Sequence, residues 1–157
     1  MPTRAIFDCM LFIQAISNDR GAAGACFHLV EDRRVQLLMS PEIWHEVRDV
    51  LSRSAMARKF PVLNTSRPAT FLKQIALLAE TVPHVPKSFA LPRDPDDEPY
   101  TDLAIAANAD YLVTWNDRHL TYLMRRDTPE GIDFCARFPA LKIVDPPTFL
   151  REAFAQS

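Results

Sequence analysis

Glycine is scarce in this chain, with three among 157 residues. This leaves no glycine-rich phosphate loop and no dinucleotide-binding fingerprint, because both motifs need several glycines at fixed spacing. Cysteine is equally scarce, and its three positions are too scattered for a disulfide framework or a thiolate zinc site. His28, His45 and His84 lack the spacing of zinc ligands. We therefore expect buried thiols in a reducing cytosol.

Excess charge and long apolar runs are also lacking. The net charge of -2 gives no global field for a polyanion, so a nucleic-acid partner would need local attraction or a metal ion. No run approaches the ~18 apolar residues of a membrane span. The N-terminal segment MPTRAIFDCMLFIQAI lacks the pattern of a secretory signal. We expect a soluble, cytoplasmic protein, and without a repeat or linker residues 1–157 are expected to form a single domain.

Short apolar runs alternate with helical patterns along the chain. The expected strands are continuous apolar runs, which is typical of a parallel sheet covered on both faces. We therefore predict an α/β fold, a three-layer sandwich with a central, mainly parallel sheet flanked by helices. Strands are expected at 5–7, 35–39, 111–115 and 141–144. Helices are expected from about 11, at 20–31, 41–57, 69–81 and 99–109, near 118–125 and 128–137, and from about 147. Irregular segments are expected at 61–70 and 82–99.

Acidic residues occur where such a sheet binds ligands, which is beyond the carboxyl ends of its strands. Asp8 follows the first strand, and Asn116 and Asp117 follow the strand at 111–115. An N-cap of the next helix is an equally good interpretation of Asp8 alone. These positions predict a polar site at one edge of the sheet.

Further carboxylates lie on the predicted helices. Glu46 is at the edge of an apolar stripe, where an unpaired acid is costly to desolvate, although a solvated helix acid is the commoner case. Asp97 precedes the helix at 99–109, and Asp102 lies among apolar residues of that helix. Glu98 and Asp102 are four residues apart, so they share one helix face.

Such a cluster of acids needs a counter-charge. Like charges within about 4 Å repel by several kcal/mol at an intermediate dielectric. Magnesium or manganese prefers oxygen ligands of this kind. One or two such ions would activate a water and steady the leaving oxygen of a phosphodiester.

Three blocks carry a family resemblance, IFDCMLFIQAI, SPEIWHEV and DPDDEPYTDLAIAANADYLVTWNDRHL. Together they resemble the PIN-domain nucleases, in particular the VapC-like toxins of type II toxin-antitoxin systems. The resemblance implies a metal-dependent ribonuclease that uses Mg2+ or Mn2+. It assigns the catalytic and metal-binding roles to Asp8, Glu46, Asp97, Asp102 and Asn116. Asp117, next to Asn116 at the end of the same strand, is a further candidate metal ligand by its position.

The resemblance also implies partners, namely an RNA substrate, a cognate antitoxin and a second copy in a homodimer. Arg93 and Arg118 are candidates for phosphate contacts, with ordinary ion pairs as the alternative. Thr114 is a further candidate for substrate binding, and its hydroxyl is expected to fix the turn after its strand. Trp115 would either stack on a base or belong to the core.

Two positions depart from the family pattern. Met10 stands where a small polar residue is usual, and Asn116 where an aspartate is common. They leave open a non-catalytic RNA- or protein-binding domain with a degenerate site. Met10 also removes the second acid of a haloacid dehalogenase-type phosphatase, which likewise begins with an acid after a strand.

Overall fold

A parallel five-stranded sheet forms the centre of the protein in our computed structural model, which describes residues 2–91 and 94–155. The strand order is β3-β2-β1-β4-β5, and all four pairings are parallel. β1 is in the middle and is buried over its last three residues. The strands are β1 (Thr3–Phe7), β2 (Val35–Met39), β3 (Glu80–Thr81), β4 (Tyr111–Val113) and β5 (Lys142–Val144).

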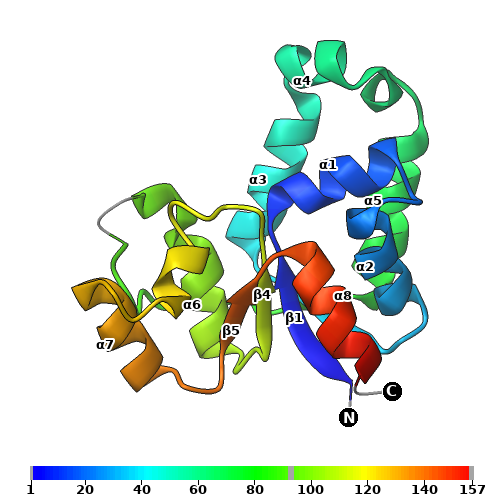
Figure 1. The fold of residues 1–157 in the computed structure, drawn as a ribbon. Helices are drawn as coiled ribbons and strands as arrows, with labels where there is room; N and C mark the ends of the chain where they lie inside the picture. Colours follow the sequence, from blue (N-terminus) through cyan, green and yellow to red (C-terminus); the bar gives the residue numbers. More distant parts are fainter. Residues whose placement is uncertain (1, 92–93, 156–157) are drawn as a thin grey trace.

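Helices cover both faces of the sheet, as Figure 1 shows, with α2, α5 and α8 on one side and α6 and α7 on the other. This confirms the predicted three-layer α/β fold. The helices are α1 (Cys9–Ser17), α2 (Ala22–Glu31), α3 (Pro41–Ser52), α4 (Ser54–Lys59), α5 (Arg67–Leu78), α6 (Glu98–Ala106), α7 (Pro129–Arg137) and α8 (Pro146–Ala155), with 3-10 turns at Pro61–Asn64, Pro95–Asp97 and Thr121–Met124. None of the helices in the described ranges is long and apolar enough to cross a membrane.

Aromatic side chains fill the core on the side of α2. Phe27 makes edge contacts with Phe7 at 5.1 Å and with Phe12 at 4.9 Å between ring centroids. Phe149 of α8 packs on Phe7 and on Tyr111 in the same way. Such contacts add to the burial of large apolar surface, which holds α1, α2 and α8 firmly against the sheet.

Three expectations about elements were wrong in detail. The helix expected at 41–57 is divided into α3 and α4 because Arg53 has an extended backbone. Part of the segment expected to be irregular at 61–70 is helical, since α5 already begins at Arg67. The helix expected to reach 81 ends at Leu78, and after Ala79 the residues Glu80 and Thr81 form the edge strand β3 beside β2.

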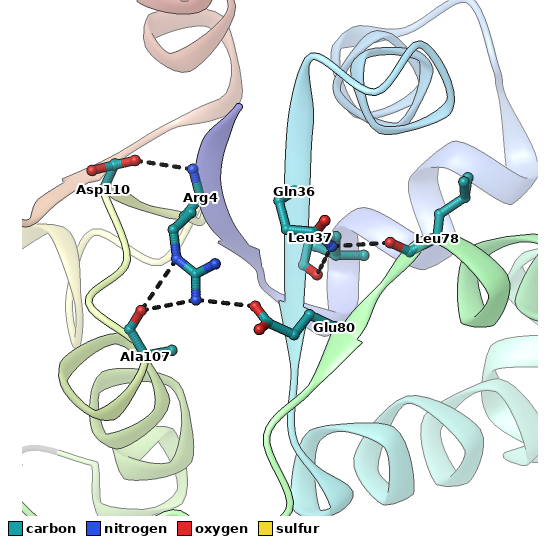
Figure 2. Close-up of polar contacts among 7 residues, drawn as sticks. All are labelled: Arg4, Gln36, Leu37, Leu78, Glu80, Ala107 and Asp110. Carbon is teal, nitrogen blue, oxygen red and sulfur yellow. Dashed lines mark hydrogen bonds and ion pairs between the residues drawn. The ribbon is translucent and has the colours of Figure 1, made fainter. Parts of the chain in front are cut away.

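Arg4 ties three elements together at the amino end of β1, opposite to the end where the predicted site lies (Figure 2). Its guanidinium donates to the carbonyl of Ala107 just after α6, at 3.1 and 3.3 Å, and pairs with Glu80 of β3 at 3.0 Å. Its backbone N–H donates to Asp110 Oδ2. Asn108 adopts a left-handed conformation with φ of 51°, which ends α6 and lets the chain enter β4. These contacts fix the direction in which α6 presents its first turn to the other end of the sheet.

Candidate active site

The carboxyl ends of β1 and β4 lie side by side. Phe7 pairs with Val113, so the two residues that follow, Asp8 and Thr114, are neighbours. The Thr114 hydroxyl donates to Asp8 Oδ2 at 2.6 Å and accepts from the backbone N–H of Asn116 at 3.0 Å. The predicted role of Thr114 in fixing this turn is thus confirmed, and the same hydroxyl also orients Asp8.

Asp8 is also the N-cap of α1. Its Oδ1 accepts from the backbone N–H of Met10 at 3.1 Å. The cap interpretation and the site interpretation of this residue are therefore compatible. A carboxylate at a helix N-terminus is stabilised by the free N–H groups and the helix dipole, so the fold itself holds Asp8 in place with its side chain at the sheet edge.

Glu46 reaches the same region from α3. This helix begins as predicted, with the Ser40 hydroxyl accepting from the backbone N–H of Ile43 and a proline at its first turn. The Glu46 carboxylate accepts from the Tyr100 hydroxyl at 2.8 Å and contacts Cys9 Sγ at 3.5 Å. The Tyr100 oxygen in turn accepts from the backbone N–H of Cys9 at 3.2 Å.

Tyr100 and Cys9 were not predicted as site residues. Burial and the neighbouring acids raise the pKa of both groups far above their ordinary values, so both stay protonated and act as donors. The sequence offers a weak signal for Tyr100, which lies three residues after Asp97 at the start of a helix. An aromatic at that position is indistinguishable from a core residue until Glu46, distant in the chain, is placed beside it.

Asp97 completes the group from the turn before α6. Its Oδ2 accepts from Asn116 Nδ2 at 2.9 Å. Burial, together with the charges of Asp94, Asp8 and Glu46, raises the pKa of Asp97 to about 7. Hydrogen bonds and charge coupling thus bring together four of the predicted residues from separate segments, namely Asp8, Glu46, Asp97 and Asn116.

Asn116 is oriented by both ends of its side-chain amide. Its Oδ1 accepts from the backbone N–H of His119 at 3.1 Å while Nδ2 faces Asp97. The amide therefore closes the turn after β4 and supplies a hydrogen-bond donor to a carboxylate. An aspartate at this position would instead add a fourth negative charge.

Asp102 has other contacts. It is almost fully buried, and its Oδ1 accepts from the backbone N–H groups of Ser88 and Phe89 at 2.9 and 3.2 Å. Glu98 shares its helix face, as predicted, and accepts from the backbone N–H of Leu91 at 3.0 Å. Within residues 2–91 and 94–155, no hydrogen bond joins Asp102 to Asp8, Glu46 or Asp97.

The remaining candidates lie at the periphery. Asp117 is exposed, accepts from the Thr121 hydroxyl at 2.6 Å and is 4.0 Å from Arg125. Arg118 is exposed on the same turn. Arg93 lies outside the described residues. Trp115 is 47% exposed, so the interpretation of this residue as part of the core was wrong.

The donor set suits a hard divalent cation. All the side-chain groups that meet are oxygen donors or orient them. Burial is the main cause of the raised pKa of Asp97, and the charges of Asp94, Asp8 and Glu46 add to it, so a cation would favour the charged form of this carboxyl group. In the described part of the chain, no three Asp, Glu, His or Cys side chains lie in ligating geometry. Thr114, Tyr100 and Asn116 instead hold the three carboxylates by hydrogen bonds.

Comparison with known families agrees with this architecture. A PIN domain family model matches residues 4–118. The chain therefore belongs to the PIN domain family, whose members are generally nucleases and generally use divalent metal ions. The matched range contains all the carboxylates of the site.

One solved structure shows how far the fold is shared. The crystal structure of VapBC2 from Rickettsia felis, bound to a DNA fragment from their promoter, matches with a TM-score of 0.54 and 14% sequence identity. The match covers 91% of this chain and 98% of that chain. No curated protein matches the sequence at a significant level.

Proposed function

We propose that this chain is a divalent-metal-dependent endoribonuclease that hydrolyses phosphodiester bonds of RNA. The observation that carries the proposal is the convergence of Asp8, Glu46 and Asp97, which come from three separate segments, at the carboxyl edge of the sheet. Burial and the charge of Asp94 raise the pKa of Asp97 to about 7, and the charges of Asp8 and Glu46 contribute in the same direction. Mg2+ or Mn2+ is the proposed counter-charge.

The three carboxylates would hold the cation, with Asn116 supporting Asp97. When bound, the ion lowers the pKa of a water and stabilises charge on the leaving oxygen. Thr114 keeps Asp8 turned toward the site, and Tyr100 does the same for Glu46. Below about pH 7 the Asp97 carboxyl group is mostly protonated in the cation-free protein, so a cation that binds it would have to displace this proton.

Asp102 and Asp117 were also predicted as metal ligands, Asp102 from its apolar surroundings and the resemblance, and Asp117 from its place after the strand at 111–115. The contacts of Asp102 favour a different role for it, which is to support the segment at 88–91 beside α6. Asp117 is exposed, and its carboxylate accepts a hydrogen bond from the Thr121 hydroxyl, so it lies apart from the group. We therefore propose Asp8, Glu46, Asp97 and Asn116 as the primary site. Measurements of metal binding will decide whether Asp102 and Asp117 are ligands as well.

A toxin of a two-gene module is the proposed biological role. It is supported by the motifs of the sequence and by the fold shared with the VapBC2 structure. A small cognate protein that covers the acidic site is the partner this role requires, and a homodimer would place two sites along one groove. A non-catalytic binding domain is the second candidate, because Asn116 brings no charge and its carbonyl is occupied by His119.

Cleavage of single-stranded RNA tests the proposal. We expect the wild-type protein to cleave with Mg2+ or Mn2+ and to stop in EDTA. Asp8→Asn should reduce the rate at least ~100-fold, because it removes a charge from the cation site. Asp127→Asn, on the exposed turn before α7, is the matched control and should cleave like wild type. A folded Asp8→Asn protein with undiminished metal-dependent activity would overturn the assignment, and a wild-type protein that binds but never cleaves RNA would favour the second candidate.

A further inference from the structure

Trp115 presents an exposed aromatic ring from the turn that holds the carboxylates of the proposed cation site. Its two chain neighbours are Thr114, which holds Asp8, and Asn116, which holds Asp97. Its side chain is 47% exposed, although large aromatic side chains are costly to leave in water. Neither the proposed cation site nor the core uses this ring.

The indole is held in one orientation. Its Nε1 donates to Gln14 Oε1 of α1 at 2.9 Å. Gln14 lies one helical turn after Met10, so both project from the same side of α1. A ring fixed in this way loses little conformational entropy when a ligand covers it.

A hollow of about 360 Å³ adjoins the ring. Its polar lining consists of hydroxyl and carboxylate groups, contributed by Thr114, Asp117, Thr121, Asp145 and Thr148. The Asp145 carboxylate accepts from the backbone N–H of Thr148 at 2.9 Å. Hydrogen bonds from the Thr148 side chain and backbone lower the pKa of Asp145, so it is ionised at neutral pH. Two carboxylates repel a phosphate and instead accept hydrogen bonds from the amino and imino groups of a nucleobase.

We propose that Trp115 and this hollow form a subsite that stacks one nucleobase of single-stranded RNA next to the scissile phosphate. The inference rests on the proposed ribonuclease function and adds the part of the substrate that this surface recognises. Stacking on an aromatic ring is tolerant of sequence because every base has a flat face. The hollow beside the ring then contacts the edge of the stacked base.

Tryptophan fluorescence reports on the subsite directly. The chain has two tryptophans, and Trp44 is buried with its Nε1 bound to the Thr81 hydroxyl, so it supplies a constant background. Hexaadenylate mixed rapidly with the wild-type protein in Mg2+ should quench the emission before cleavage proceeds. A ribose-phosphate chain of the same length without bases should not. Equal quenching by both chains would overturn the proposal.

Binding of labelled hexaadenylate to variants supplies the second measurement. Trp115→Leu should bind about tenfold or more weakly, since stacking is worth about 1–3 kcal/mol per base. Trp115→Phe, which keeps a ring, should recover most of the affinity. Thermal unfolding of both variants checks that they are folded. Unchanged affinity in folded Trp115→Leu would overturn the subsite and leave the exposed ring to a protein contact.

The two proposals fail in different ways. If hexaadenylate quenches the tryptophan fluorescence but the protein cleaves no RNA, the subsite stands and the ribonuclease assignment is refuted. If Trp115→Leu cleaves RNA at the wild-type rate at subsaturating substrate, the subsite is refuted and the ribonuclease assignment stands.

Discussion

The side chains that orient the carboxylates decide how well the site is formed. Tyr100 is the most informative of them, because one buried hydroxyl serves both Glu46 and the start of α1. It donates to the Glu46 carboxylate and accepts from the N–H of Cys9. Metal ligands of proteins are commonly oriented by such a second hydrogen-bond partner.

Tyr100→Phe should lower metal-dependent RNA cleavage about 10- to 100-fold, the range typical of lost partners of metal ligands. Unfolding should also require about 1–3 kcal/mol less, because the N–H of Cys9 and the Glu46 carboxylate lose a buried partner. Steady-state kinetics and urea denaturation measure the two effects.

Tyr111→Phe is the matched control for Tyr100→Phe, since Tyr111 is a buried tyrosine at the far end of β4. It should leave cleavage unchanged. A Tyr100→Phe protein with wild-type cleavage would show that Glu46 needs no help from this hydroxyl.

Residue types and their order predicted much of the candidate site. Asp8, Glu46, Asp97 and Asn116 were identified from their places after strands and beside helices together with the family resemblance, and the structure joins them. Tyr100 was missed because its role depends on a contact across 54 positions of sequence. Asp102 was interpreted as a ligand because it lies among apolar residues, but a buried carboxylate can equally be satisfied by backbone N–H groups, and sequence does not distinguish the two.

At the scale of elements, α6 organises one side of the site. Its first turn carries Glu98, and Asp102 follows four residues later, and both accept hydrogen bonds from the segment at 88–91. Phe89 of that segment packs on Phe134 of α7 at 5.1 Å. The buried charge of Asp102 therefore connects α6 to α7 through a segment without regular structure.

Asp102→Ala should lower the free energy of unfolding by about 2–4 kcal/mol, because two backbone N–H groups lose a charged acceptor. Asp102→Asn keeps an acceptor oxygen and should cost less. Chemical denaturation measures both. If Asp102 supports this segment and does not bind metal, folded Asp102→Asn keeps wild-type Mn2+ affinity. A tenfold loss of Mn2+ affinity in Asp102→Asn would restore it as a ligand.

Sequence patterns predicted the long buried elements best. β2 matches its expected bounds because all five residues form one largely buried run. β3 was missed because Glu80 and Thr81 are both exposed and only pairing with β2 makes them a strand. The break between α3 and α4 was also missed, since residues on both sides of Arg53 favour helix and only the backbone of Arg53 departs from it.

For the whole molecule, the acidic site links stability to pH. Burial and nearby charges raise the pKa of Asp97 to about 7, above the ordinary aspartate value of 3.8 expected in the unfolded chain. Between these values the folded protein binds more protons than the unfolded one. The contribution of the Asp97 carboxyl group to the free energy of unfolding is therefore fully present below about pH 4. It is lost as the pH rises through about 7.

The cation-free wild-type protein should thus lose thermal stability relative to Asp97→Asn as pH rises from about 5 to 8, by a few degrees in Tm, because screening by solvent moderates the effect. Added Mn2+ should raise the wild-type Tm at pH 8 and leave Asp97→Asn nearly unchanged. Differential scanning calorimetry at several pH values measures both. Parallel Tm profiles for the two proteins would contradict the assigned coupling.

Titration of Mn2+ into the protein, followed by calorimetry or electron paramagnetic resonance, tests most directly whether the three carboxylates form one cation site. Wild type and the surface control Asp127→Asn should bind alike, and Asp8→Asn and Asp97→Asn should each bind at least about tenfold more weakly, since the number of charged ligands sets affinity. Equal Mn2+ binding by all four proteins would mean that no ion is held by these residues, and the account of the site would fail.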